Sequence, residues 1–441
     1  MDTPIFDFVR AYADSQTSRL HMPGHKGKSF VGCESLDITE IKGADSLFEC
    51  SGIICESEKN ASSVFGSHTF YSTEGSSLCI RAMVYLAMLY AKECKKAPRI
   101  LAARNVHKTF LSAAALLDVE VEWMFSEDNY LTSEITPDRL ECEINKHHPF
   151  AVYLTSPDYL GNVADVESLS KVCKKYEVIL LVDNAHGAYL KFLERSMHPT
   201  DLGADMCCDS AHKTLPALTG GAYLHVSYDA PRLFVEQAKN ALSLFASTSP
   251  SYLILSSLDN LNPYLKSEYK VELCELLKKT ARLKDALAEH GYTLLGDEGL
   301  KITIRTTDFG YFGYEFADIL REDGFECEFS DKEHVVLMLT PQIDGECLKK
   351  LEASLLSIER KKRIIEAAPR FVTPKRKTSI REAALSISET LPAKECLGRT
   401  LALATVSCPP AVPILVCGEE IDENALSVIE YYGIDELCVI K

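Results

Sequence analysis

The feature that most limits the fold of this chain is a short apolar run, residues 178–182 (VILLV), that ends directly in a carboxylate, Asp183. Such a run is typical of a strand buried on both faces, as in a parallel sheet. Residues 100–103 and 151–155 have the same character, and amphipathic segments separate the three runs. The alternation over residues 60–250 therefore predicts a doubly wound α/β sheet, in which ligands bind at the carboxyl ends of the strands.

Composition narrows the class of protein. A chain of 441 residues can bury one large core with smaller additions. The net charge of −17 argues against nucleic-acid binding and is compatible with cationic substrates. No apolar run approaches the ~18 residues that cross a bilayer, and the start of the sequence lacks a basic region followed by an apolar one, so we expect a cytoplasmic protein. The sixteen cysteines show no C-x-x-C spacing, and we interpret them as small buried apolar residues and expect no metal site.

Two further segments, together with the apolar run that ends in Asp183, predict a site for pyridoxal phosphate. Residues 209–225 (DSAHKTLPALTGGAYLH) place Lys213 between a histidine and two hydroxyls. Residues 72–77 (STEGSS) precede an apolar helical stretch, and small hydroxyl residues with a glycine at a helix start suit a phosphate. Taken singly, the lysine could be a solvated loop residue and the helix start an ordinary N-cap. An amine, a carboxylate for the ring nitrogen and phosphate donors are, however, the three groups that this cofactor requires.

These segments resemble the Orn/Lys/Arg decarboxylase family of fold-type-I pyridoxal-phosphate enzymes. The resemblance also rests on residues 21–27 (HMPGHKG), 104–109 (RNVHKT) and 156–161 (SPDYLG) and, near the end of the sequence, on 380–383, 398–399, 408–415 and 418–419. It runs nearly end to end. It implies the fold-type-I PLP-dependent transferase fold, α/β with a mostly parallel sheet between helices and a smaller α+β C-terminal region.

The resemblance also implies roles for individual residues. Lys213 would carry the cofactor, Asp183 would pair with its ring nitrogen, and His186 would lie beside the reacting carbon. Either Lys213 or His186 is the proton donor to that carbon, and the sequence leaves the choice open. His107 would stack on the ring, Ala185 would pack under it, and hydroxyls and His212 would hold the phosphate. The full set of expected cofactor-binding residues is Gly75, Ser76, Ser77, His107, Asp183, Ala185, Ser210, His212 and Lys213.

Recognition of the substrate is expected to involve Glu328, which the resemblance matches to a carboxylate facing the distal end of the substrate. The alternative is that Glu326, Glu328 and Asp331 form a solvated acidic turn. The sequence also departs from the usual family pattern at Cys408 to Pro413, at Gly220 and at residues 45–48. These departures leave cofactor binding intact and leave the substrate open.

The sequence predicts four parts: residues 1–60 as an N-terminal arm, 61–265 as a large PLP-binding domain, 266–368 as a small α+β domain and 369–441 as a C-terminal decarboxylase-type domain. Within them we expect an amphipathic helix from about residue 271, a helix over 311–320 and a strand over 334–339. The glycines at 310 and 313 are interpreted as a turn. The segment at 21–27 belongs to no predicted core element, so we expect it at a subunit boundary of a homodimer or higher homo-oligomer.

The predicted function is PLP-dependent decarboxylation of a basic amino acid, arginine, lysine or ornithine, to the amine and carbon dioxide, with polyamine biosynthesis as the expected role. An aminotransferase or lyase would use the same cofactor groups but needs an arginine that grips the α-carboxylate. Arg370, Arg381 and Arg399 are candidates for that arginine. A catalytically weak PLP-binding relative is the remaining alternative, since fold does not fix function.

Overall fold

The computed structural model describes residues 1–125, 135–366, 368–370, 372–403 and 413–441. The expected motif at 408–412 therefore lies outside the described residues. The chain divides into two compact units, residues 1–97 with 166–272 and residues 98–165 with 273–441. The predicted division into four parts stays a prediction.

Seven strands form the main sheet in the order β1-β7-β6-β5-β4-β2-β3. Strand β5 is parallel to β6, and β2 is parallel to both β3 and β4, whereas β7 is antiparallel to β1 and β6. The strand bounds are β1 His68–Ser72, β2 Arg99–Ala103, β3 Glu120–Met124, β4 Ala151–Thr155, β5 Ile179–Asp183, β6 Met206–Asp209 and β7 Ala222–Val226. The three predicted strands correspond to β2, β4 and β5, and the predicted mostly parallel α/β fold is confirmed.

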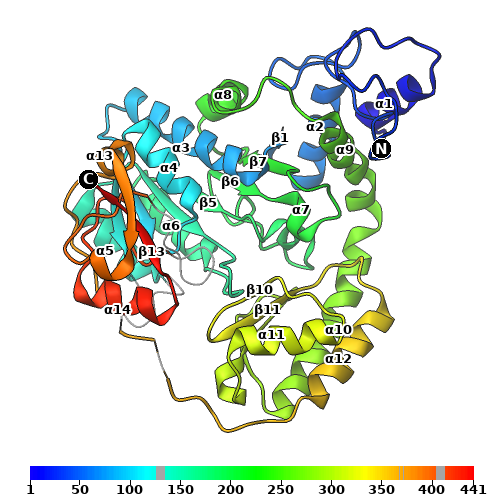
Figure 1. Cartoon of the computed structure of the whole chain (residues 1–441). Helices are drawn as coiled ribbons and strands as arrows, with labels where there is room; N and C mark the ends of the chain where they lie inside the picture. The colour runs from blue at the N-terminus through cyan, green and yellow to red at the C-terminus, as the bar shows by residue number, and fades with distance from the viewer. Residues whose placement is uncertain (126–134, 367, 371, 404–412) are drawn as a thin grey trace. The chain divides into compact units, whose positions relative to one another are not determined.

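The first unit contains β1, β5, β6 and β7 with the helices that follow or precede them. Helix α3 starts three residues after β1 and contacts all four strands, as Figure 1 shows. Helix α1 contacts α2 and α9, and Asp259 of α9 accepts hydrogen bonds from the backbone of Ile5 (2.8 Å) and Phe6 (3.0 Å). The helix bounds are α1 Pro4–Asp14, α2 Ile53–Phe65, α3 Gly75–Glu93, α6 Val166–Lys175, α7 Ala211–Thr214, α8 Arg232–Ser243 and α9 Tyr252–Ser267, with a 3-10 turn η1 Ala188–Phe192.

The second unit contains β2, β3 and β4, helices α4 Lys108–Leu117 and α5 Pro137–His147, and a separate antiparallel sheet in the order β10-β11-β9-β8. The elements of this smaller sheet are β8 Thr293–Leu295, β9 Lys301–Arg305, η2 Thr306–Phe309, α11 Gly313–Glu322, β10 Phe329–Ser330, β11 His334–Met338 and α12 Gly345–Ser357. The helix predicted at 311–320 and the strand predicted at 334–339 are thus α11 and β11. Gly310 has a φ of 95°, which confirms the predicted turn.

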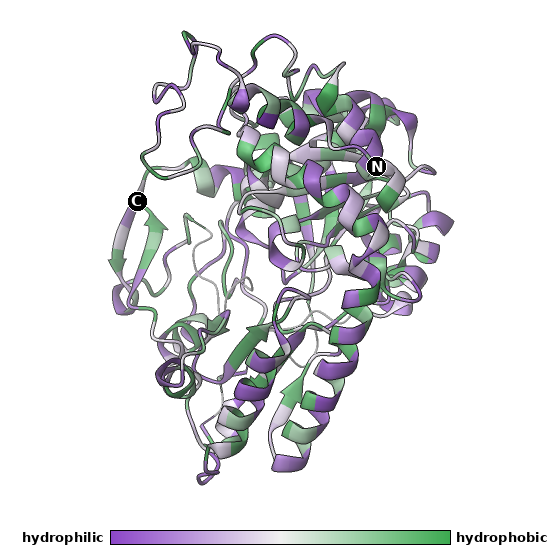
Figure 2. Ribbon diagram, turned by 90° about the vertical axis from the view of Figure 1, so that its right-hand side faces the viewer, coloured by the Kyte–Doolittle hydropathy of each residue, from purple (hydrophilic) through white to green (hydrophobic). Residues whose placement is uncertain are grey.

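Helix α10, Tyr269–His290, is the predicted amphipathic helix. Its buried leucines Leu273, Leu276, Leu283 and Leu287 recur at intervals of three, seven and four residues, which places them on one face of a helix. Figure 2 shows apolar and polar residues alternating along the long helices at the bottom of that view. The apolar face explains why this segment is a stable helix despite its many charges.

The last segment forms a small packed layer of the second unit, with α13 Ile380–Leu385, β12 Ser388–Pro392, η3 Ala393–Glu395, α14 Glu423–Tyr431 and β13 Glu436–Ile440. Strands β12 and β13 pair antiparallel. A buried ion pair fastens this segment to the residue after β2: Arg104 donates to both carboxylate oxygens of Glu419, at 2.9 and 2.7 Å. Both side chains are almost fully buried, so each charge depends on the other.

Replacing Glu419 with glutamine should destabilise the second unit by about 3–5 kcal/mol, because it leaves the Arg104 guanidinium buried without a counter-charge. Urea denaturation followed by circular dichroism measures the loss. The neighbouring Glu420→Gln is the matched control, since Glu420 pairs with Lys377 at a partly exposed position (3.1 Å) and such pairs contribute at most about 1 kcal/mol. Equal effects of the two substitutions would contradict the prediction.

Candidate active site

Lys213 lies in the one-turn helix α7, next to His186. Its Nζ is 2.9 Å from His186 Nε2, and the lysine side chain is half-buried. The helix ends at Thr214 because Leu215 precedes a proline and is extended, with ψ 153°. The sequence therefore holds this amine on a short, rigid turn beside an imidazole, as predicted from the two motifs.

Asp183 is the last residue of β5, and it is 2% exposed. Its Oδ1 accepts a hydrogen bond from Ala185 N at 3.2 Å and contacts Cys208 Sγ at 3.6 Å. Cys208 is its register partner on the parallel strand β6. The carboxylate is thus fixed by its own turn and by the strand that leads to α7.

The start of α3 is the segment in which a phosphate site was predicted. Gly75 has a φ of 70°, and its N–H donates to Gly220 O at 2.8 Å. The side chain of the N-cap residue, Glu74, makes no capping hydrogen bond to the helix, and a helix start carries the positive end of the dipole. Ser210 Oγ donates to Ser76 Oγ at 2.8 Å. The predicted phosphate residues from the two motifs therefore meet at this helix start.

The remaining predicted cofactor residues divide between the two units. Ala185 is buried in the turn after Asp183. Nδ1 of the His212 ring lies 3.0 Å from Gly221 O. His107 belongs to the second unit. It is the N-cap of α4, and its Nδ1 accepts a hydrogen bond from Thr109 N at 3.2 Å.

A buried polar network behind Lys213 was not predicted. Asp209, the last residue of β6, is fully buried, and its Oδ2 lies 3.2 Å from Nε2 of both His198 and His225. Its Oδ1 accepts a hydrogen bond from Asn184 Nδ2 at 2.7 Å. Burial alone would raise the pKa of Asp209, but the two histidines lower it well below its usual range. The network joins the residue after Asp183 to the residue before Ser210.

His198 and Asp209 of this network, together with Cys207, carry atoms that can bind a metal. Ligand atoms of His198, Cys207 and Asp209 lie within 4.8 Å of one another. Burial raises the pKa of the Cys207 thiol. Each nitrogen of His198 also has a hydrogen-bonding oxygen nearby, on Thr200 and Asp209. We interpret the group as a hydrogen-bonded network.

Glu328 lies in the second unit, just before β10, and its side chain is exposed. Its Oε1 accepts a hydrogen bond from the Tyr159 hydroxyl at 2.8 Å. Burial and this carboxylate raise the pKa of Tyr159. Glu326 instead pairs with Arg321 at 3.1 Å, so the two glutamates of the predicted acidic turn have different surroundings.

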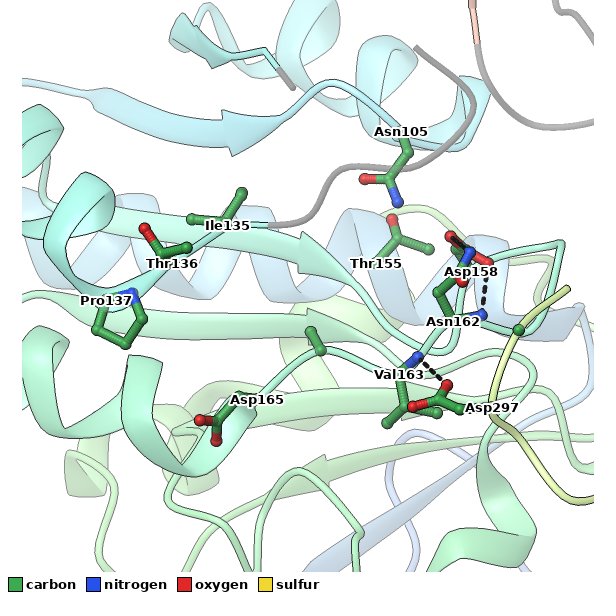
Figure 3. A pocket seen from close by; sticks show the side chains of 12 residues that line it. Asn105, Ile135, Thr136, Pro137, Thr155, Asp158, Asn162, Val163, Asp165 and Asp297 are labelled. Atoms are coloured by element: carbon green, nitrogen blue, oxygen red, sulfur yellow. Dashed lines mark hydrogen bonds between the residues drawn. The ribbon is translucent and has the colours of Figure 1, made fainter. Parts of the chain in front are cut away.

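The second unit also contains an acidic cavity of about 550 Å³. Figure 3 shows its polar side chains converging from the ends of β2 and β4 and from the loop before β9. The lining residues are Asn105, Ile135, Thr136, Pro137, Thr155, Asp158, Asn162, Val163, Ala164, Asp165, Gly296 and Asp297. Asp158 belongs to a motif that the sequence analysis singled out, whereas Gly296 and Asp297 carried no signal.

The fold and the grouping of an amine, a buried carboxylate and an anion-binding helix start define a fold-type-I α/β enzyme. Residues 3–303 match the family described as "Orn/Lys/Arg decarboxylase, major domain". The chain belongs to this family of amino-acid decarboxylases, as the sequence motifs indicated.

Relatives of known name agree with this assignment. An arginine decarboxylase of Halalkalibacterium halodurans is 29% identical over 468 residues, covering 97% of this chain and 92% of that protein. An arginine decarboxylase of Bacillus subtilis is 28% identical and covers 97% of this chain and 93% of that protein. The solved structure of lysine decarboxylase A from Pseudomonas aeruginosa has a TM-score of 0.82 at 18% identity, covering 99% of this chain and 80% of that one. Within the described residues, none of the helices is long and apolar enough to cross a membrane.

Proposed function

We propose that this chain is a pyridoxal-phosphate-dependent decarboxylase of a basic amino acid, arginine, lysine or ornithine. The observation that carries the proposal is the meeting, in one compact unit, of Lys213 with His186, of Asp183 at the end of β5, and of Ser76 with Ser210 at an uncapped helix start. Family membership supplies the reaction class. The named relatives include both arginine and lysine decarboxylases, so the choice among basic amino acids rests on assay.

The residues present fit the proposed cofactor. Hydroxyl donors and the positive end of the helix dipole suit its phosphate, the buried carboxylate of Asp183 suits a protonated ring nitrogen, and Lys213 supplies the amine that holds it. When bound, pyridoxal phosphate withdraws the electron pair left at Cα as carbon dioxide departs. His107 and Ala185 are proposed to flank the ring, and Gly75, Ser77 and His212 to complete the phosphate contacts.

Each protein group then has a proposed task. Asp183 holds a proton on the ring nitrogen, because a fixed buried carboxylate favours the charged form of its partner. Lys213 would hold the cofactor through its amine. The Nζ–Nε2 contact of 2.9 Å lets a proton pass between Lys213 and His186, so either group can return a proton to Cα.

The alternative of an aminotransferase has less support from two of the three candidate arginines, Arg381 and Arg399. Arg381 donates to the backbone oxygens of Ala115 and Leu116 at 2.9 and 3.0 Å. Arg399 donates to Glu389 at 2.8 Å. Both guanidinium groups are thus committed to partners other than a substrate carboxylate. Incubation with arginine, lysine and ornithine, with separate measurement of carbon dioxide, amine and keto acid, decides between the reactions: keto acid without amine would reject the proposal.

We further propose polyamine biosynthesis in the cytoplasm as the biological role. The fifteen described cysteines are all free thiols, which supports a reducing compartment. The distal cation of the substrate is proposed to bind Glu328, whose carboxylate is oriented by Tyr159.

Glu328→Gln should raise KM for the basic substrate about tenfold or more while leaving cofactor affinity unchanged, because the neutral amide no longer pairs with the substrate cation. Steady-state kinetics and cofactor titration measure the two effects. Glu326→Gln is the control, since that carboxylate already pairs with Arg321. An unchanged KM for Glu328→Gln would move recognition to another residue.

At least a homodimer is proposed. The segment around the motif at 21–27 exposes large apolar side chains, with Leu20 94%, Met22 67%, Phe30 81% and Val31 87% exposed. A cluster of this kind indicates a surface covered in the assembly. We expect sedimentation at the assay concentration to give a dimer or larger species, and fully active monomer would contradict this.

A further inference from the structure

The acidic cavity of the second unit contains buried oxygen atoms that lack partners. Asn105 is 4% exposed, and within the described residues nothing donates to its Oδ1 or to Thr155 Oγ1. Both side chains project into the cavity in Figure 3. Because a buried polar atom without a hydrogen bond is costly, these two oxygens indicate that a donor-rich ligand completes the site.

The carboxylates of the cavity are held in place by short local bonds. Asp158 is 4% exposed and accepts hydrogen bonds from Asn162 N at 2.9 Å and from Asn162 Nδ2 at 2.7 Å. Asp297 Oδ1 accepts one from Val163 N at 3.0 Å. A carboxylate can accept about four hydrogen bonds, so both groups keep acceptor capacity. Figure 3 shows hydrogen bonding between Asp158 and Asn162 and between Asp297 and Val163 as dashed lines.

The charges around the cavity favour a cation. Among its twelve lining residues, all of them described, there is no lysine, arginine or histidine. Lys301 contacts this wall and is occupied by Glu298 at 3.3 Å and by Asp158 O at 2.8 Å. Lys284, another basic group near Asp297, donates to Glu298 O at 2.6 Å. Asp165 directly precedes helix α6, where the helix dipole balances its charge.

We propose that this cavity binds a linear aliphatic amine that carries a cation at each end and no carboxylate. The oxygens of Asn105, Thr155, Asp158 and Asp297 accept N–H bonds from ammonium or guanidinium groups, and a diamine can reach more than one of them. A free basic amino acid is disfavoured because its α-carboxylate would meet these carboxylates without a basic residue to pair with. The cavity volume of about 550 Å³ lies in the usual range for small-molecule sites.

The ligand class includes the amines that the proposed reaction releases, and to that extent the inference rests on the proposed function. The binding itself requires no turnover. The cavity is formed entirely by residues of the second unit, whereas Lys213, His186 and Asp183 belong to the first.

The test is titration of the purified holoenzyme with agmatine and cadaverine by isothermal calorimetry, with arginine as the carboxylate-bearing comparison. Asp297→Asn and Thr155→Val should each weaken amine binding, and Asp158→Asn should weaken it about tenfold or more. Asp297 is exposed and its substitution leaves folding intact, which keeps the test valid if Asp158→Asn unfolds. Asp138→Asn, an exposed carboxylate outside the lining, is the matched control and should bind like wild type.

Amine affinity that is equal in wild type and all three lining variants would place the amine elsewhere and overturn the inference. A parallel loss of arginine affinity in these variants would also overturn it, because the cavity would then hold the substrate. If no amino acid is decarboxylated but amine binding still depends on Asp297, the proposed function fails and this inference stands. If an amino acid is decarboxylated but amine binding is the same in all variants, the proposed function stands and this inference fails.

Discussion

Replacing Lys213 with alanine should abolish decarboxylation and remove the yellow colour expected of the purified protein, because the cofactor loses the amine to which it is bound. Borohydride reduction of the wild type followed by peptide mapping should place the pyridoxyl group on Lys213. The effect on kcat is expected to be several orders of magnitude, the largest of any substitution in the chain.

The sequence provides its own control for this experiment. Lys108 also follows a histidine, His107, but it lies exposed at the start of α4. Lys108→Ala should keep the colour and the pyridoxyl label at Lys213. A label on a peptide from elsewhere in the chain would reject Lys213 as the cofactor lysine.

Asp183→Asn should retain much of the bound cofactor while slowing decarboxylation by several orders of magnitude. The amide has the shape of the carboxylate, so the contacts with Ala185 and Cys208 can persist. A neutral partner, however, no longer stabilises the protonated ring nitrogen that makes the cofactor an electron acceptor. Single-turnover kinetics with saturating substrate, together with a cofactor titration, separates the two effects.

The matched control for this substitution is Asp229→Asn, which removes an exposed carboxylate in the turn after β7. It should leave both cofactor content and rate unchanged. If Asp183→Asn turned over at a rate near that of the wild type, Asp183 would not be the partner of the ring nitrogen.

The elements that could be predicted from the sequence are those with a local signal. Strand β5 is a continuous apolar run, and the position of Asp183 at its end follows from the alternation of strands and helices. Helices α10 and α11 follow from their periodicity. Ser76, Ser210 and Lys213 were predicted to share a site through motif resemblance, and the first unit brings the two serines together.

The parts that could not be predicted depend on contacts between distant residues. Arg104 and Glu419 are separated by 315 positions. Nothing in the sequence around either residue predicts the other as its partner. The network of Asp209 joins loops and strands from residue 184 to residue 225, although Asp209 begins the segment 209–225 from which Lys213 was predicted. The acidic cavity depends on Asp297, an ordinary surface residue until the loop before β9 is folded.

The buried Asp209 network makes the lysine-bearing turn sensitive to acid. Burial lowers the pKa of His225, and the pKa of Asp209 is lowered by its two histidines. For both groups the unfolded chain binds protons more tightly, so the stability they provide is complete only above their unfolded pKa values. The stability that His225 provides declines as the pH falls below about 6.5, and the stability that Asp209 provides declines as the pH falls below about 3.8. Since Asp209 leads directly into α7, acidification undermines the support of the turn that carries Lys213.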